Sequence, residues 1–316
     1  MKQTNFFLHI SKIILFSGIL VATASARAEL KVVTTIKPLH SLISNVMDGV
    51  GEPGLIIDGS ISPHSFTMKP SHAKMLEEAD VIFWIGEGIE TSMEEPLDSI
   101  AKDAEVIEFM ELDSIAKLKF REESIFGDHD DHDDHDDHDD HDEHAHGDHD
   151  PHAWLSPQIA KVWLNVIAAK LSEADPDNAG KYFSNAKLAR DNMDSLVSEV
   201  NSILDPIRDK KFVVFHDAYQ YFEKDFGISA SGAISLGDAS DPSPARLAEI
   251  RKRVVDEAVE CVLAEPQYKQ GLVKAVVEGT NANTAVIDPL GVKLESGPDL
   301  YENLIRNLAT NLAKCF

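Results

Sequence analysis

Apolar runs of strand length alternate along the chain with stretches in which apolar residues recur at helical spacing. Short β-branched runs bounded by turn residues predict buried strands, and a period near 3.6 residues predicts amphipathic helices. The predicted strands are 30–36, 55–57, 81–85, 105–109, 212–215, 228–234, 261–264 and 284–287. The predicted helices are 38–50, 71–79, 91–102, 157–174, 218–226, 243–258, 268–279 and 299–314. This alternation in both halves predicts an α/β fold with two lobes of mainly parallel sheet and flanking helices.

A longer helical pattern separates the two halves. From 177 to 209 there is no Gly after Gly180 and no Pro until Pro206, and apolar residues keep helical spacing. One helix of that length would span roughly 50 Å and join the lobes rigidly, whereas the alternative is two shorter helices broken near Asp191. The predicted organisation is an N-terminal lobe (29–175), one long connecting helix (176–209) and a C-terminal lobe (210–316).

The first 28 residues have the pattern of a secretory signal peptide. Lys2 and Lys12 form a positive region, 13–22 is a short apolar run, and Ala26-Arg27-Ala28 fits a small-x-small cleavage site. The apolar run is too short for a comfortable transmembrane helix, although a retained membrane anchor is the alternative. We therefore expect cleavage after residue 28 and a mature protein outside the cytoplasm.

The chain is strongly acidic, with a formal net charge of −26. Loss of the signal, which carries three basic residues and no acid, would make the charge −29. Such a balance argues against nucleic acid as a partner, because phosphates would be repelled, and it favours cations.

One segment, 128–150, concentrates this charge. It contains twelve Asp, one Glu and eight His, with His at every third residue from His129 through His144. No apolar face runs through it, so it cannot fold alone, and a solvated acidic linker is the alternative interpretation. Imidazoles and carboxylates are ligands for divalent transition metals. We predict an accessory metal loop that uses His129, His132, His135, His138, His141, His144, His146 and His149.

The chain has two cysteines, Cys261 and Cys315. In an exported protein an even pair suggests a disulfide, which would hold the C-terminal helix to the body. Two free thiols are the alternative, and zinc ligation by the pair is disfavoured because the two lack the close spacing of a thiolate site.

Four residues outside the His-rich segment occupy loops at strand or helix ends. His64 follows the second strand, His152 precedes a helix, and His216 and Asp288 directly follow strands. Ligands of doubly wound α/β folds bind beyond the carboxyl ends of the strands. Three neutral imidazoles and one carboxylate suit a tetrahedral divalent metal. His40 and His72 fall within helical patterns and are interpreted as helix-surface residues.

The motifs around these residues resemble a known family. They are Ser62-Pro63-His64, DPHAWL at 150–155, FHDAY at 215–219, AEPQ at 264–267 and IDPLG at 287–291. Together and in this order, over essentially the whole mature chain, they resemble the metal-binding solute receptors of ABC importers, and most closely the zinc receptors. The acidic His-rich insertion, the long helix and the late cysteine pair fit the same family.

The resemblance implies a ligand set. His64, His152 and His216 match the three motif histidines, and Asp288 matches the carboxylate that completes the site in many relatives. The sequence departs from some zinc receptors at Pro63, where they carry a Glu that is a possible fourth ligand. The fourth position then falls to Asp288 or water, with Glu265 as an alternative ligand or a residue that orients one. An imidazole-rich set favours zinc over manganese.

The function expected from these features is a periplasmic solute-binding protein, not an enzyme. It would capture Zn²⁺ as its transported ligand and deliver it to the membrane permease of an ABC zinc importer. A secreted zinc-dependent hydrolase is the main alternative, although no HExxH pair occurs. A metal-buffering or adhesion protein acting through its His-rich loop is the other. No GxSxG elbow and no GxxxxGK[ST] phosphate loop occurs.

Overall fold

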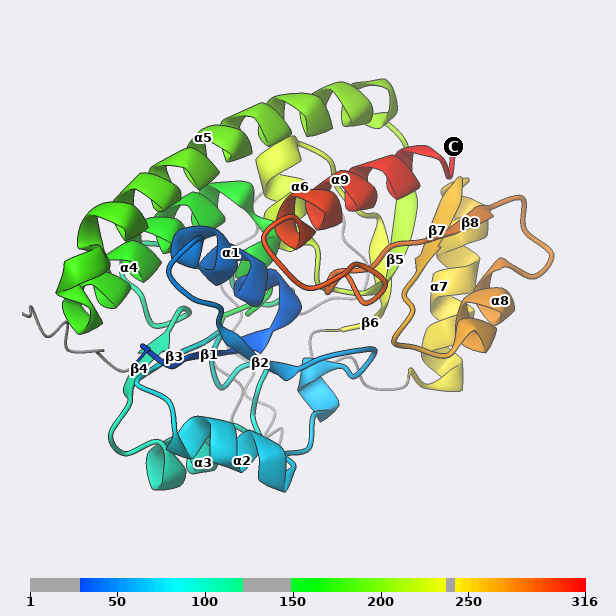
Figure 1. The fold of residues 1–316 in the computed structure, drawn as a ribbon. Coiled ribbons are helices and arrows are strands. Elements are labelled where there is room, and N and C mark those ends of the chain that lie inside the picture. The colour runs from blue at the N-terminus through cyan, green and yellow to red at the C-terminus, as the bar shows by residue number, and fades with distance from the viewer. Residues whose placement is uncertain (1–28, 122–148, 237–241) are drawn as a thin grey trace, which may run out of the picture.

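The computed structural model describes residues 29–121, 149–236 and 242–316 (Figure 1). The predicted signal peptide, and the histidines of the acidic segment from His129 to His146, lie outside the described residues. No helix in the described part of the chain is both long enough and apolar enough to cross a membrane.

The first half forms a four-stranded parallel sheet in the order β2-β1-β3-β4. Its strands are β1 (Val32–Ile36), β2 (Gly54–Ile57), β3 (Val81–Trp84) and β4 (Glu105–Glu108). The central strands β1 and β3 are buried along their whole length, as expected for a sheet covered on both faces. The helices of this half are α1 (Lys37–Met47), α2 (Pro70–Glu77), α3 (Glu94–Ile100) and α4 (Pro157–Ala174).

The second half repeats the plan with the order β6-β5-β7-β8, again fully parallel. Its strands are β5 (Phe212–His216), β6 (Gly232–Ser235), β7 (Cys261–Ala264) and β8 (Asn283–Val286). Its helices are α6 (Gln220–Phe226), α7 (Pro244–Asp256), α8 (Gln270–Val277) and α9 (Leu300–Ala313). In both sheets the strand order reverses beside the first strand of the half, which creates a crevice where ligands bind in folds of this type.

A single helix, α5 (Ala179–Leu204), separates the halves, so the alternative of a break near Asp191 is wrong. It has 26 residues and a length of about 39 Å, shorter than the 50 Å expected from the sequence. Its buried residues recur at spacings of three and four, which places them on one face: Tyr182, Ala186, Ala189, Met193, Leu196, Val200 and Leu204. This face packs on α1 and α4 of the first half and α9 of the second (Figure 1).

The predicted disulfide is confirmed: Cys261 at the start of β7 is bonded to Cys315 beyond α9. Asn283 at the start of β8 also donates a hydrogen bond to the carbonyl of Cys315, over 2.8 Å. The C-terminal helix, which packs on α5, is thereby fastened to the second sheet at two neighbouring strands.

The predicted α/β fold with two parallel sheets and a long joining helix is confirmed. Several predicted elements were too long at their ends, most clearly the helix expected at 91–102, which is α3 (Glu94–Ile100). Thr91 and Ser92 form a turn, and the fully buried Met93 anchors the chain to the core before the helix begins.

Candidate metal centre

Three histidines from three separate segments meet between the two sheets. His64 lies in the short 3-10 helix η1 (Pro63–Ser65) after β2, His152 directly precedes η2 (Ala153–Leu155), and His216 is the last residue of β5. One ring nitrogen from each lies within 4.8 Å of the others, and the two Nε2 atoms of His64 and His152 are 3.3 Å apart. Among the described residues, these three form the group of side chains able to hold a metal ion.

The three imidazoles line a small cavity with apolar walls. His152 and His216 are only 1% and 2% exposed, whereas His64 is partly exposed. The same cavity is lined by Trp154, Tyr268 and Leu290, among others. Two of the imidazoles are therefore held in the interior, and the third is partly accessible to solvent.

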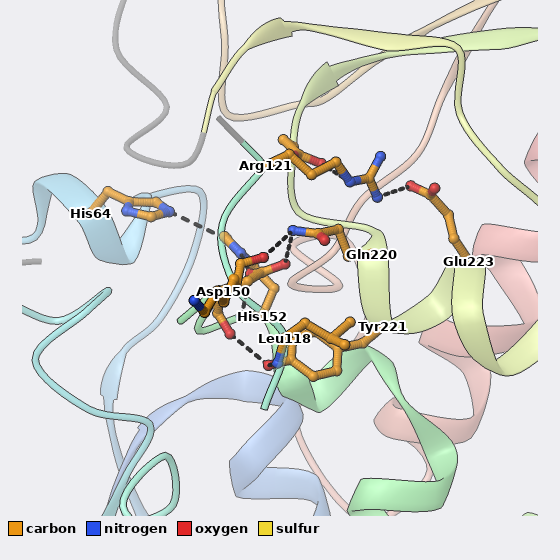
Figure 2. Close-up of polar contacts among 10 residues, drawn as sticks. His64, Leu118, Arg121, Asp150, His152, Gln220, Tyr221 and Glu223 are labelled. Carbon is orange, nitrogen blue, oxygen red and sulfur yellow. Dashed lines mark hydrogen bonds and ion pairs between the residues drawn. The ribbon is translucent and has the colours of Figure 1, made fainter. Parts of the chain in front are cut away.

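The carboxylate of Asp150 orients His152, as Figure 2 shows. Nδ1 of His152 donates to Oδ1 of Asp150 over 2.6 Å, and the backbone N–H of His152 donates to the same oxygen over 3.0 Å. The amide of Gln220 donates to Oδ2 of Asp150, also over 3.0 Å. With its proton on Nδ1, the ring presents the lone pair of Nε2 toward His64 and His216, an arrangement typical of metal-ligating histidines.

Burial disfavours charge on both members of this pair. Desolvation lowers the pKa of His152 to about 3, so the imidazole is neutral and able to bind metal at pH 7. Desolvation also raises the pKa of Asp150 to about 7, while the backbone N–H of His152 and the guanidinium of Arg121 oppose that rise. We take the histidine as the hydrogen-bond donor because the Asp150 carboxylate also accepts from the Gln220 amide.

Asp288, the predicted fourth ligand, lies outside the histidine group. Its Oδ1 accepts hydrogen bonds from the backbone N–H groups of Leu290 and Gly291 and from the amide of Gln267, and its Oδ2 accepts from the N–H of Val292. The carboxylate therefore holds the loop after β8 in shape. Glu265 is 2% exposed and lines the cavity with the histidines, and desolvation raises its pKa to about 8.

The other predicted histidine roles can be compared with the structure only in part. Of the His-rich segment, His149 is described, and it forms an isolated antiparallel bridge with Lys119. His40 and His72 lie in α1 and α2, where they are half-buried. His40 Nε2 hydrogen-bonds the Pro53 carbonyl, and His72 Nδ1 accepts from the N–H of Lys69.

Asp150 is the last residue of the predicted His-rich loop, and a contact between it and His152 was not predicted. The structure instead buries its side chain completely, and its N–H donates to the carbonyl of Leu118 over 2.8 Å. The one local signal was the position of an Asp two residues before His152 in the DPH motif. Gln220 and Tyr221, which complete the contacts of Asp150, had no local signal because they lie 70 and 71 residues away.

Comparison with known proteins places these features in a family. The model of a family described as "Zinc-uptake complex component A periplasmic" matches residues 32–315. A protein of Brucella abortus named High-affinity zinc uptake system protein ZnuA is 46% identical over 303 residues, covering 90% of this chain and 91% of the relative.

Solved structures share the fold at lower sequence identity. A crystal structure of ZnuA superposes with a TM-score of 0.74 at 22% identity, covering 90% of this chain and 98% of that one. The SBP FpvC of Pseudomonas aeruginosa in complex with Mn²⁺ superposes with a TM-score of 0.76 at 19% identity, covering 91% and 98%. Since one of these structures contains manganese, the fold alone does not select the metal.

Proposed function

Because this chain belongs to the family of periplasmic zinc-uptake components, we propose that it is the solute-binding receptor of an ABC-type zinc importer. It captures Zn²⁺ between its two sheets and delivers the ion to a permease in the membrane. The periplasm is the compartment implied by the family, and the Cys261–Cys315 disulfide suits such an oxidising environment. Cleavage after Ala28 would release the mature chain.

The observation that carries this proposal is the convergence of three imidazoles from separate segments of the chain. Their nitrogen atoms lie within 4.8 Å of one another. A tetrahedral ion at about 2.0–2.1 Å from each nitrogen holds its ligands about 3.4 Å apart, close to the 3.3 Å between the Nε2 atoms of His64 and His152, so the group needs only to contract slightly around an ion. Imidazole is a borderline ligand that suits zinc, whereas Mg²⁺, Ca²⁺ and Mn²⁺ prefer carboxylate and carbonyl oxygen. The ion is the cargo of the protein, so the ligands must bind it tightly and also release it to the permease.

We assign the fourth ligand to Asp288, on the motif resemblance and on its place after β8. The carboxylate would turn one lone pair to the metal while keeping part of its contact with the loop at 290–292. Asp288→Asn should therefore lower zinc affinity. The Tm of the metal-free variant shows how much the loop contacts of Asp288 contribute to stability. Glu265→Gln is the matched variant for the other candidate carboxylate. If it lowers affinity and Asp288→Asn does not, the assignment moves to Glu265.

The His-rich segment acts in this scheme as an accessory. Its negative charge would concentrate cations around the protein, and its histidines and carboxylates would bind them more weakly than the folded body does. Equal rates of zinc transfer with and without the segment, at limiting zinc, would remove this role.

The decisive test is a chelator-competition titration with Zn²⁺ of mature protein lacking residues 128–147. The deletion stops short of Asp150 because that side chain contacts His152. Tight binding of one equivalent supports a site in the folded body. Loss of tight binding would place the site in the deleted segment and favour a metal-buffering protein. A screen of the zinc-loaded protein for ester and peptide hydrolysis tests the remaining alternative, a hydrolase.

A further inference from the structure

A short segment of the first half, 118–121, is packed against the end of the acidic segment and the start of α6. The N–H of Asp150 donates to the carbonyl of Leu118, and Lys119 bridges to His149. On the other side, the hydroxyl of Tyr221 accepts from the N–H of Leu118 over 3.0 Å and donates to the carbonyl of Asp150 over 2.8 Å. The segment therefore touches both the chain that carries His152 and the helix that follows His216.

Arg121 extends this link through its guanidinium (Figure 2). Its Nη2 lies 2.9 Å from Oε1 of Glu223, and its Nε lies 3.6 Å from Oδ1 of Asp217. The two carboxylate side chains are 6% and 2% exposed, and that of Arg121 is 19% exposed. Charged groups this deep are expensive to bury unless they are paired, so the geometry of the cluster is strongly constrained.

The cluster is adjacent in sequence to two of the three histidines. Asp217 directly follows His216, and Asp150 precedes His152 by two residues. Gln220 closes the connection, because its amide donates both to Oδ2 of Asp150 and to the carbonyl of Lys119. Fixing 118–121 against α6 thus fixes the positions of both ligands, whose ring centroids are 4.8 Å apart.

We propose that Arg121, together with Tyr221, is a positioning residue that sets the separation of His152 and His216 and thereby the affinity of the site for a small tetrahedral ion. This inference rests on the proposed zinc site. Neither side chain contacts the metal. Their role is to hold two ligands in the binding geometry before the ion arrives. Removing a residue that hydrogen-bonds and orients a metal ligand typically lowers metal affinity by roughly 10- to 100-fold.

The test compares Arg121→Gln with Arg306→Gln in the full mature chain. Arg306 makes a similar ion pair, 2.8 Å from Glu199, on the outer helices α9 and α5. Zinc affinity is read by chelator competition at one equivalent, and the visible absorption of bound Co²⁺ reports ligand geometry. We expect Arg121→Gln to weaken zinc binding about 10- to 100-fold and to alter the Co²⁺ bands. Arg306→Gln should leave the zinc affinity and the Co²⁺ bands unchanged. Arg121→Lys should give an intermediate affinity, because a single ammonium group cannot contact both carboxylates as the forked guanidinium does.

If both variants lower Tm alike while zinc affinity and the Co²⁺ spectrum stay unchanged, the positioning role is wrong. Should Arg121→Gln fail to fold, Tyr221→Phe removes a single hydroxyl and is expected to weaken binding roughly 3- to 10-fold. Unchanged affinity in Tyr221→Phe would also overturn the inference. His216→Ala in the same assay separates the two hypotheses. If His216→Ala loses zinc binding while Arg121→Gln keeps the affinity of the unchanged protein, only the positioning role is contradicted. If His216→Ala still binds zinc tightly, the zinc site itself is contradicted.

Discussion

The two halves of this protein share one strand order but contribute unequally to the candidate metal centre. In the second half His216 is the last residue of the first strand of its sheet, β5, so the strand itself positions the imidazole. In the first half neither histidine is on a strand: His64 lies in η1 and His152 beside η2, and His152 is oriented by Asp150. The main support of His216 is therefore its own strand, whereas that of His152 is a hydrogen bond to a neighbouring carboxylate.

Part of that support crosses between the halves. The indole N–H of Trp154 donates to the carbonyl of Pro289 over 2.8 Å, and the hydroxyl of Tyr301 donates to the carbonyl of Trp154 over 2.8 Å. The ammonium of Lys37 donates to the carbonyl of Leu294 over 2.5 Å. These contacts hold the halves together beside the site, which implies a largely preformed site and limited movement on binding.

The largest expected effect comes from removing ligands in the two halves separately. Zinc bound by four ligands is stabilised by about 10–16 kcal/mol, so each ligand accounts for roughly 3–4 kcal/mol, or two to three decades of affinity. We expect His216→Ala and His152→Ala to lose on the order of 1,000-fold. His64→Ala should lose less, because a water molecule can replace a partly exposed ligand. His72→Ala is the control, and chelator competition is the measurement. Equal losses at all three positions would mean that the partial exposure of His64 makes no difference to its contribution.

Acid should weaken zinc binding as well. Protons compete with the metal for imidazole, and ordinary histidines take up a proton near pH 6.5. Burial lowers the pKa of His152 to about 3, so this ligand remains available between pH 7.5 and 5.5. We expect zinc affinity to decrease over that range, because metal binding requires deprotonated ligands. Competition titrations at the two pH values give the result, and constant affinity would contradict a site built on imidazoles.

The disulfide belongs to the second half alone and should affect stability without affecting the metal. Cys261 and Cys315 are 54 residues apart in sequence, and loss of a native disulfide typically costs about 2–5 kcal/mol. We expect the double variant Cys261→Ser/Cys315→Ser to have a lower free energy of unfolding in denaturant and nearly unchanged zinc affinity. A large loss of affinity would mean that the C-terminal helix helps to hold His216.

Much of the fold could be predicted because its signals are local. The run at 81–85 is apolar on both faces, as a central parallel strand must be, and the spacing of Ala186, Ala189 and Met193 identifies one face of α5. The start of α3 was predicted too early because burial of Met93 depends on the rest of the core. The three histidines could be singled out from their places in motifs and at strand ends.

The environment of those histidines could not be predicted. Asp150 looked like one more acid in a charged run, and only its place two residues before His152 distinguished it. Its burial depends on Gln220 and Tyr221, which approach only when the second half folds against the first. Glu90, which follows β3 and is completely buried, was not predicted to be buried, because a sequence does not show which carboxyl groups the core will enclose.

The smallest expected effect compares two buried carboxyl groups near the third strand of each sheet. Glu90 follows β3, and Glu265 directly follows β7. Desolvation raises the pKa of Glu90 from 4.5 to about 7 and that of Glu265 to about 8. The folded state therefore favours the protonated acid. The stabilisation that comes from holding the acid protonated is fully present below about pH 4.5. It is lost as the pH rises through the pKa of the group in the folded state, so each group lowers the free energy of unfolding at alkaline pH.

Glu90→Gln removes an ionisable group and should raise the free energy of unfolding at pH 8 by on the order of 1–3 kcal/mol, with little change at pH 4.5. Urea unfolding at the two pH values measures the difference, and the exposed Glu95→Gln is the control. Glu90→Gln should leave zinc affinity unchanged, whereas Glu265→Gln should also lower it, because Glu265 lines the cavity with the three histidines. If Glu90→Gln and Glu265→Gln both change the free energy of unfolding and neither changes zinc affinity, the two halves differ at the site only in their histidines and in the residues that orient them.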